Sequence, residues 1–195
     1  MKNFASTFYK NLLLAIESIQ VFSQEKGETK FFEALEIACE LLISRSALGN
    51  KLIFIGNGAS AAISSHMSTD FWKNGGIRSV AFNDSSLLTC ISNDYGYKHV
   101  FEKPIEMFAD PGDVLLAVSS SGKSENILKG VEAARMKECH VLTFSGFSND
   151  NPLRSLGDLN FYVPSDEYGP VEIIHLSICH CILDTIIDFN SNAEN

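Results

Sequence analysis

The chain has 195 residues, 45% of them hydrophobic and 20% charged, which is typical of one folded globular domain rather than a disordered chain. Its net charge of −9 argues against a nucleic-acid-binding surface, because such a surface needs a basic patch to neutralise phosphates. Residues 1–20 carry polar side chains every few positions, so we expect no signal peptide, no membrane partner and a cytoplasmic protein.

Two amphipathic helices are predicted first, over residues 4–22 and 29–47, and Gly49 is a suitable stop for the second. Five short apolar runs then predict buried strands, at 51–55, 80–82, 114–118, 141–144 and 159–163. Helical segments are predicted between or after them, around 59–73, 85–92, 98–109, 124–137 and 170–189. This alternation predicts an α/β fold with a parallel sheet, whose ligands bind at the loops after the strands.

Two of these loops combine glycine with serine. Residues 56–60 read Gly-Asn-Gly-Ala-Ser and Ser119–Ser124 reads Ser-Ser-Ser-Gly-Lys-Ser, and each loop opens a predicted helix. Hydroxyls and backbone N–H groups at a helix N-terminus favour a bound anion. Helix capping alone needs one serine, so the four serines of the second loop indicate a phosphate site.

Both loops also resemble nucleotide motifs. Residues 56–61 fit the dinucleotide fingerprint, with Asp84 near the place of its acidic residue, but a dinucleotide site leaves the serine loop unexplained. The serine loop is one residue short of a triphosphate-binding loop, and Ala117 stands where that loop needs its first glycine. Both nucleotide interpretations are therefore disfavoured.

Histidines and carboxylates gather on two of the predicted helices. His66 and Asp70 lie four residues apart and share a helix face, so they suit a metal ion or acid–base chemistry. The last helix carries Glu172, His175 and His180. Glu172 and His180 lie ~12 Å apart along that helix, so one site takes both only if Glu172 bends inward or two subunits contribute.

The cysteines are odd in number and scattered, and with no secretion signal they indicate reduced thiols in a cytosolic protein. Cys179 and Cys181 flank His180, which raises the question of a metal cluster. Residues two apart on a helix point about 200° apart, so we expect core thiols instead.

Taken in order, the motifs resemble the sugar isomerase (SIS) domain and, within it, the phosphoheptose isomerases. The matching segments are residues 56–60, SNDYG at 92–96, residues 111–135 around the serine loop, and the terminal E-x-x-H-x-x-x-x-H. The resemblance implies one SIS domain over residues 1–195, with a helical pair at 1–48 that packs the subunits of a homotetramer. It implies for residues 49–195 a three-layer α/β sandwich around a five-stranded parallel, flavodoxin-like sheet.

The resemblance also implies an aldose–ketose isomerase that interconverts sedoheptulose 7-phosphate and D-glycero-D-manno-heptose 7-phosphate, or acts on a related sugar phosphate, through an enediol. It places one zinc ion in each site, and the sites form between subunits. The implied substrate-binding residues are Asn57, Gly58, Ser60, Asp94, Ser119, Ser120, Ser121 and Ser124. The implied zinc ligands are His66, Asp70, Glu172 and His180, with Asp70 and His180 as the acid–base pair.

The chain departs from the family pattern at several of these positions. The family usually has Glu at position 70, Gln at 172, Arg at 74 and an Asp-Arg pair where this chain reads Gly169-Pro170-Val171. These changes are consistent with a catalytic role shifted partly to Glu172, with a different phosphosugar, or with a non-catalytic SIS module that senses a phosphosugar or binds a protein partner. The four intact potential ligands favour the enzyme, because a binding module needs the serines and not His180.

Overall fold

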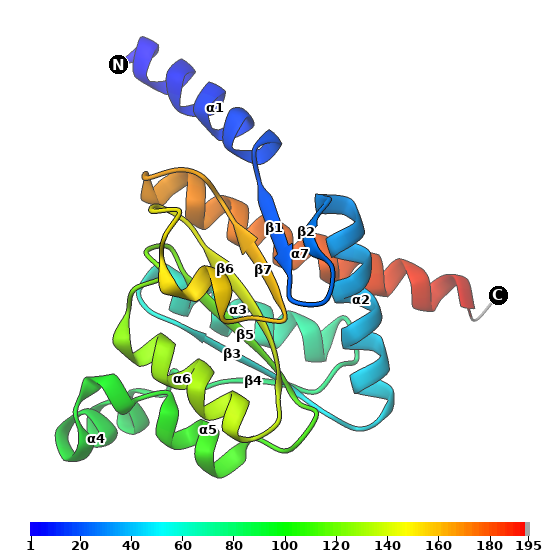
Figure 1. The fold of residues 1–195 in the computed structure, drawn as a ribbon, viewed down its shortest axis with the longest axis vertical. Coiled ribbons are helices and arrows are strands. Elements are labelled where there is room, and N and C mark those ends of the chain that lie inside the picture. Colours follow the sequence, from blue (N-terminus) through cyan, green and yellow to red (C-terminus); the bar gives the residue numbers. More distant parts are fainter. Residues whose placement is uncertain (194–195) are drawn as a thin grey trace.

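The computed structural model describes residues 1–193 and shows one sheet between two layers of helices (Figure 1). The helices and strands, in chain order, are α1 (Lys2–Glu17), β1 (Gln20–Ser23), β2 (Gly27–Thr29), α2 (Phe31–Ala47), β3 (Leu52–Gly56), α3 (Ala59–Lys73), β4 (Ser79–Ala81), α4 (Ser85–Tyr95), α5 (Glu102–Phe108), β5 (Val114–Ser119), α6 (Glu125–Met136), β6 (His140–Ser145), β7 (Leu159–Tyr162) and α7 (Tyr168–Ala193). Short 3₁₀ helices, η1 (Tyr97–His99) and η2 (Pro152–Ser155), lie in two of the connections.

The sheet has seven strands in the order β2-β1-β7-β6-β5-β3-β4. The five strands from β3 to β7 are parallel and follow the flavodoxin-like order, as predicted. The prediction of a five-stranded sheet is wrong in strand number, because β1 and β2 extend the sheet beyond β7 as antiparallel strands.

The N-terminal region accounts for this difference. The helix predicted over 4–22 ends at Glu17, and residues 20–23 form β1, which pairs with β7 so that Val21 lies opposite Phe161. The strand alternates in burial, since Val21 is 3% exposed and Phe22 is 46% exposed. The helix predicted over 29–47 likewise begins at Phe31, after β2. The predicted helical pair at 1–48 is therefore two helices separated by a β-hairpin.

Alternate residues of the central strands enter two separate cores. Leu52 and Phe54 of β3 pack with residues of α2, α3 and α7 on one face of the sheet. Ile53 and Ile55 pack with residues of α5 and α6 on the other face. Strands buried on both faces are typical of a parallel sheet covered by helices, so the predicted three-layer sandwich is confirmed.

The neighbouring strands β3 and β5 are followed by helices on opposite faces of the sheet. Met67 of α3 belongs to one core and Val131 of α6 to the other. The chain therefore leaves β3 and β5 in opposite directions and opens a crevice at their carboxyl ends, the topological switch point of the sheet. The two glycine–serine loops follow these two strands.

Helix α7 runs past α2 and α3 along the sheet. By length and composition alone it is apolar enough to cross a membrane, but half of its apolar window is buried in the fold, and one such helix is weak evidence for a membrane span. Cys179 is buried on its inner side, whereas Cys181 is exposed, so the expectation of a core thiol is wrong for Cys181. The two side chains diverge because residues two apart lie on nearly opposite sides of a helix.

Candidate active site

A cavity of about 250 Å³ lies at the switch point between β3 and β5. Three helices begin at its wall, namely α3, α6 and α7. Its lining residues are Asn57, Gly58, Ala59, Ser60, Ser119, Ser120, Ser121, Ser124, Tyr168 and Glu172. All seven substrate-binding residues predicted in the two loops are in this set, so the structure brings both loops to one cavity.

The first loop needs glycine at two positions for geometric reasons. A side chain at Gly56 would collide with the backbone of Ser60, since α3 begins directly above the end of β3. Gly58 has a φ of +56°, a left-handed conformation that glycine adopts without strain. These glycines let the chain turn sharply from strand to helix, which places Asn57 and Ser60 at the cavity wall.

The serine loop is held rigidly by its neighbours. The backbone N–H of Gly122 donates to the carbonyl oxygen and to Oγ of Ser119, at 3.1 and 3.2 Å. Gly122 has a φ of +61°, and a side chain there would overlap Asn151. Asn151 is itself buried and bonded to the carbonyl oxygens of Gly146 and Ser148. The loop is therefore preorganised and does not need a ligand to fold.

Ser124 decides whether these serines serve only as helix caps. It occupies the N-cap position of α6, yet its side chain accepts no hydrogen bond from the N–H groups of the first turn. Its hydroxyl is thus available to a ligand, beside backbone N–H groups at the positive end of the helix dipole. This arrangement suits a phosphate group.

The cavity has no cationic side chain in its lining. None of its lining residues is Lys or Arg, and Glu172 is the only ionisable acid among them. Lys123 of the serine loop is exposed and lies 3.9 Å from the carboxylate of Asp150. An anion bound here would therefore be held by hydroxyls, backbone N–H groups and the α6 dipole.

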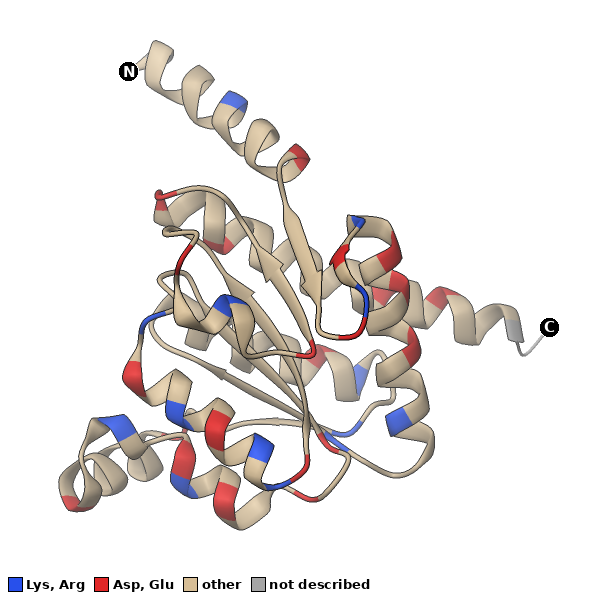
Figure 2. Cartoon of the chain, viewed as in Figure 1, with Lys and Arg blue, Asp and Glu red and all other residues tan. Residues whose placement is uncertain are grey.

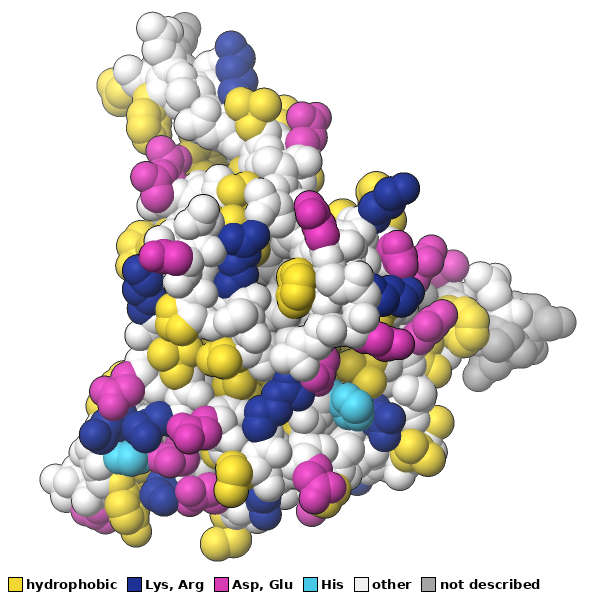
Figure 3. Space-filling model, viewed as in Figure 1, with side chains coloured by type: hydrophobic (Ala, Val, Ile, Leu, Met, Phe, Trp, Pro, Cys, Tyr) yellow, Lys and Arg dark blue, Asp and Glu magenta, His cyan; other side chains and the backbone are white. Residues whose placement is uncertain are grey.

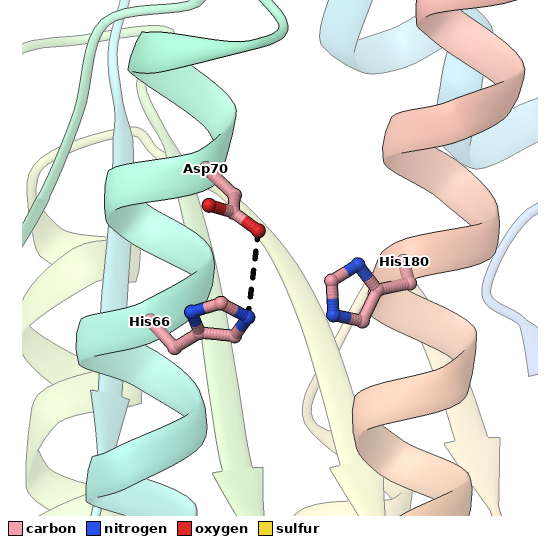
Figure 4. Close-up of side chains that lie close together, drawn as sticks. All are labelled: His66, Asp70 and His180. Atoms are coloured by element: carbon pink, nitrogen blue, oxygen red, sulfur yellow. Dashed lines mark ion pairs between the residues drawn. The ribbon is translucent and has the colours of Figure 1, made fainter.

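His66, Asp70 and His180 form a second group, outside the cavity lining (Figure 4). His66 and Asp70 project from α3 and His180 from α7, which packs against α3. The His66 Nε2 and Asp70 Oδ2 atoms are 3.4 Å apart, and the two imidazole ring centres are 5.4 Å apart. His66 is exposed, and the other two side chains are half-buried.

The three side chains fit zinc as ligands. Their ligand atoms lie within 4.8 Å of one another, and the separation of 3.4 Å between His66 and Asp70 is close to the value expected around one ion. Ligand atoms of a tetrahedral zinc site lie about 3.3 Å apart when the bonds are about 2.0 Å long. Three protein ligands leave one position of a tetrahedral zinc site for a further ligand.

Two predicted site residues lie elsewhere in the chain. Glu172 lines the cavity instead of joining the other three predicted zinc ligands, so its ligand role stays a prediction. Asp94 lies on α4, outside the cavity lining, and its carboxylate contacts Cys90 and Asn93. Its role in sugar binding also stays a prediction.

The remaining histidine of the α7 motif is structural. His175 is fully buried, and its Nε2 hydrogen-bonds the carbonyl oxygen of Ser145 at 3.1 Å. Burial lowers the pKa of His175 to about 4, so the side chain is neutral at physiological pH. Sequence reasoning missed Ala59 and Tyr168 as lining residues, because neither side-chain type signals a phosphate or a metal.

The comparisons with known proteins identify the family of the chain. The SIS domain family matches residues 22–146 of the chain. A phosphoheptose isomerase of Shewanella frigidimarina is 35% identical over 162 residues, which cover 79% of this chain and 82% of that protein. A phosphoheptose isomerase of Helicobacter hepaticus is 34% identical over 159 residues, which cover 78% of this chain and 81% of that protein.

Solved structures show the same likeness in three dimensions. A phosphoheptose isomerase from Francisella tularensis superposes with a TM-score of 0.82 and 27% identity over 96% of this chain and 98% of that one. A phosphoheptose isomerase from Neisseria gonorrhoeae superposes with a TM-score of 0.81 and 28% identity, covering 95% of this chain and 98% of that one. Since the family match spans more than half of the chain and these relatives align over most of it, the chain belongs to the SIS domain family.

Proposed function

We propose that the protein is an aldose–ketose isomerase that interconverts sedoheptulose 7-phosphate and D-glycero-D-manno-heptose 7-phosphate, or acts on a closely related sugar phosphate. One observation carries the proposal: α3 and α7 both begin at the serine cavity and both contribute to the group of His66, Asp70 and His180. His66 lies ~9 Å along α3 from Ser60. A sugar whose phosphate sits on the serine loop therefore presents its opposite, carbonyl-bearing end to these side chains.

The binding part of the proposal follows from the cavity. Backbone N–H groups, the α6 dipole and the hydroxyls of Ser119, Ser120, Ser121 and Ser124 hold the phosphate. Asn57, Gly58 and Ser60 contact the sugar hydroxyls from the other loop. The related phosphoheptose isomerases support a seven-carbon substrate.

The chemical step needs one base and one acid on neighbouring carbons. The Asp70 carboxylate removes the proton next to the carbonyl group, and His180 returns a proton to the adjacent carbon or oxygen, so that the substrate passes through an enediol. Asp70 is half-buried and carries a shorter side chain than the family's usual Glu. Glu172, at the cavity wall, is a second carboxylate available to share the role of base.

We also propose that one zinc ion binds in each site, held by His66, Asp70 and His180 of one subunit, with Glu172 of a neighbouring subunit as the predicted fourth ligand. Zinc bound there would polarise the substrate carbonyl and its neighbouring hydroxyl. The donor set of imidazole and carboxylate supports zinc, since these are ligands that zinc accepts.

The assembly and location are part of the same proposal. The protein forms a homotetramer in the cytoplasm, with α1 at a contact between subunits. Exposed apolar side chains along α1 support this assembly. Asp94 lies on α4, outside the cavity lining of its own subunit. In a site formed between subunits, Asp94 would contact the substrate bound by a neighbouring subunit.

The test is to incubate the purified protein with sedoheptulose 7-phosphate, with and without zinc, and to follow aldose formation by NMR. We expect turnover by the wild type and its loss in His180→Ala, with sugar phosphate binding retained. His140→Ala is the matched control. His140 is the first residue of β6 and lies at the amino ends of the parallel strands, away from the cavity at their carboxyl ends, so this change should leave turnover unchanged. A wild type that binds the sugar phosphate without turnover would instead be a non-catalytic SIS module.

A further inference from the structure

Three side chains from different segments form a hydrogen-bond network beside the cavity. Asn57 lines the cavity, and its Oδ1 accepts from Asn126 Nδ2 at 2.8 Å while its Nδ2 donates to Asn126 Oδ1 at 2.9 Å. The Tyr97 hydroxyl donates to the same Asn57 Oδ1 at 2.9 Å. The network thus joins the loop after β3, the 3₁₀ helix η1 and the first turn of α6.

A backbone group fixes the direction of every hydrogen bond in this network. Asn126 is 3% exposed, and its Oδ1 also accepts from the backbone N–H of Ile127 at 3.0 Å, an N–H that is shared with the carbonyl oxygen of Ser124 at the same distance. A backbone N–H can only donate, so Asn126 Oδ1 must face it. The reciprocal pair then sets the amide of Asn57, and the hydroxyl of Tyr97 has to act as the donor.

The network leaves one group of Asn57 available. Its Oδ1 accepts two hydrogen bonds, which occupies both lone pairs, and one of its two N–H groups donates to Asn126. The second N–H has no partner in the part of the chain that the structure describes. Since Asn57 lines the cavity, this N–H is a donor for an oxygen atom of a bound sugar.

Tyr97 connects this amide to the segment around α4. It follows Gly96, which has a φ of +91° and ends α4, a helix without buried residues. Lys98 lies 3.8 Å from Glu125 at the start of α6, which brings the same segment to the serine loop helix. Tyr97 therefore holds Asn57 through the same Oδ1 atom that the buried Asn126 contacts.

We propose that Asn126 and Tyr97 are positioning residues of the isomerase, which lock the Asn57 amide so that its free N–H faces the sugar. The inference rests on the proposed function for its substrate. It adds two residues that act on the sugar end of the ligand, away from the phosphate. Loss of Tyr97 removes one of the two hydrogen bonds that hold Asn57 Oδ1, and loss of Asn126 leaves the amide free to rotate and to present an acceptor where a donor is needed.

A double-mutant cycle tests whether Tyr97 acts through Asn57. Tyr97→Phe in the wild-type background should weaken sedoheptulose 7-phosphate binding and raise KM about fivefold, the size of one net hydrogen bond. The same change in the Asn57→Ala background should have no effect, because the amide is absent. Inorganic phosphate binding should be unchanged in all variants, since the serine loop alone holds it.

Matched variants separate this role from a general effect on folding. Tyr95→Phe is the control, because Tyr95 is equally exposed, lies two residues earlier and has no hydroxyl hydrogen bond within the described residues. Asn126→Leu keeps the approximate size of the anchor, adds no charge beside the serine loop and removes both hydrogen bonds to Asn57, so it should reproduce the loss in sugar phosphate binding with phosphate binding retained.

Two results would overturn the inference: an equal effect of Tyr97→Phe in both backgrounds, or a parallel loss of inorganic phosphate binding. An unchanged KM and affinity in Tyr97→Phe would overturn it as well. If the wild type binds the sugar phosphate without turnover, the isomerase proposal fails. The network is then still tested, because calorimetry measures the sugar phosphate affinity of each variant in the double-mutant cycle.

Discussion

Glu172 introduces a negative charge into a cavity built for an anion. Its carboxylate lines the same wall as the four serines, and no lining residue is a Lys or Arg that offsets it. A phosphate and a carboxylate in one small cavity repel each other unless a proton or a cation lies between them. Glu172 therefore lowers the affinity of the cavity for phosphate and provides a second carboxylate near the sugar.

Replacing Glu172 with Gln removes that repulsion without changing the size of the side chain. We expect Glu172→Gln to bind inorganic phosphate roughly threefold to tenfold more tightly, since a like charge nearby costs on the order of 1 kcal/mol at a partly exposed site. Calorimetry measures the affinity, and Glu132→Gln, an exposed residue of α6, controls for net charge. A simultaneous fall in kcat would identify Glu172 as a working carboxylate, whereas equal affinities in both variants contradict the argument.

His175 makes the stability of the protein depend on pH. Burial lowers its pKa from 6.5 to about 4, so the unfolded chain takes up a proton at a higher pH than the folded one. The contribution of the neutral side chain is fully present above pH 6.5. It is lost as the pH falls toward 4, by up to about 3 kcal/mol.

The variant His175→Gln should remove this part of the pH dependence, because glutamine does not titrate and still offers an N–H to the carbonyl of Ser145. We expect it to be less stable at neutral pH and to lose less of its free energy of unfolding between pH 7 and pH 4. Urea unfolding at several pH values measures this slope. Parallel curves for the wild type and the variant would show that His175 does not titrate on unfolding.

At the scale of elements, the serine loop depends on a conformation that only glycine supplies. Gly122 combines a positive φ with a side-chain position already filled by Asn151. We expect Gly122→Ala to lower the free energy of unfolding by at least about 2 kcal/mol and to abolish phosphate binding, since the loop must move. Urea unfolding and phosphate calorimetry measure the two effects.

Gly49→Ala is the matched control for this prediction. Gly49 also has a positive φ, +84°, but an added side chain there meets no other atom within 4 Å. It should cost about 1 kcal/mol from backbone strain alone and leave phosphate binding intact. If both variants lose similar stability and both bind phosphate, the contact with Asn151 does not hold the loop.

Elements set by local pattern were predictable, and elements set by distant partners were not. Helix α3 spans residues 59–73 as predicted, because its glycine turn and its apolar spacing are both local. Strand β1 was predicted as helix, because its apolar residues suit either structure and only pairing with β7 selects the strand. The pairing joins residues some 140 positions apart, such as Val21 and Phe161, so no local window contains it.

The site follows the same division. The serine loop, and the sharing of a face by His66 and Asp70, were predictable from spacing within one segment. The place of Glu172 at the cavity depends on how α7 crosses the sheet, which spacing along α7 does not determine. The direction of the Asn57 amide depends on Asn126, a residue of another loop–helix unit.

At the scale of the whole molecule, α1 projects away from the body (Figure 1), and side chains such as Phe4, Leu13 and Leu14 are 76%, 62% and 63% exposed. Figure 3 shows hydrophobic side chains along this projection, and Figure 2 shows few charged residues on α1. Helices rarely leave so much apolar surface in water without a partner. Phe8 of the same helix reaches Gly169 at the start of α7, beside the cavity lining. Contact through α1 would therefore bear directly on the site.

The proposed homotetramer makes α1 a test of both assembly and activity. We expect Leu13→Glu combined with Leu14→Glu to dissociate the wild-type tetramer, because two charges cannot be buried in an apolar contact without partners. Light scattering coupled to size exclusion measures the mass, and Lys10→Glu, a charge change at an exposed polar position of α1, should leave it unchanged. If the sites form between subunits, turnover falls with dissociation while the folded core keeps its melting temperature. A variant that stays tetrameric, or a wild type that is a monomer, contradicts the role assigned to α1.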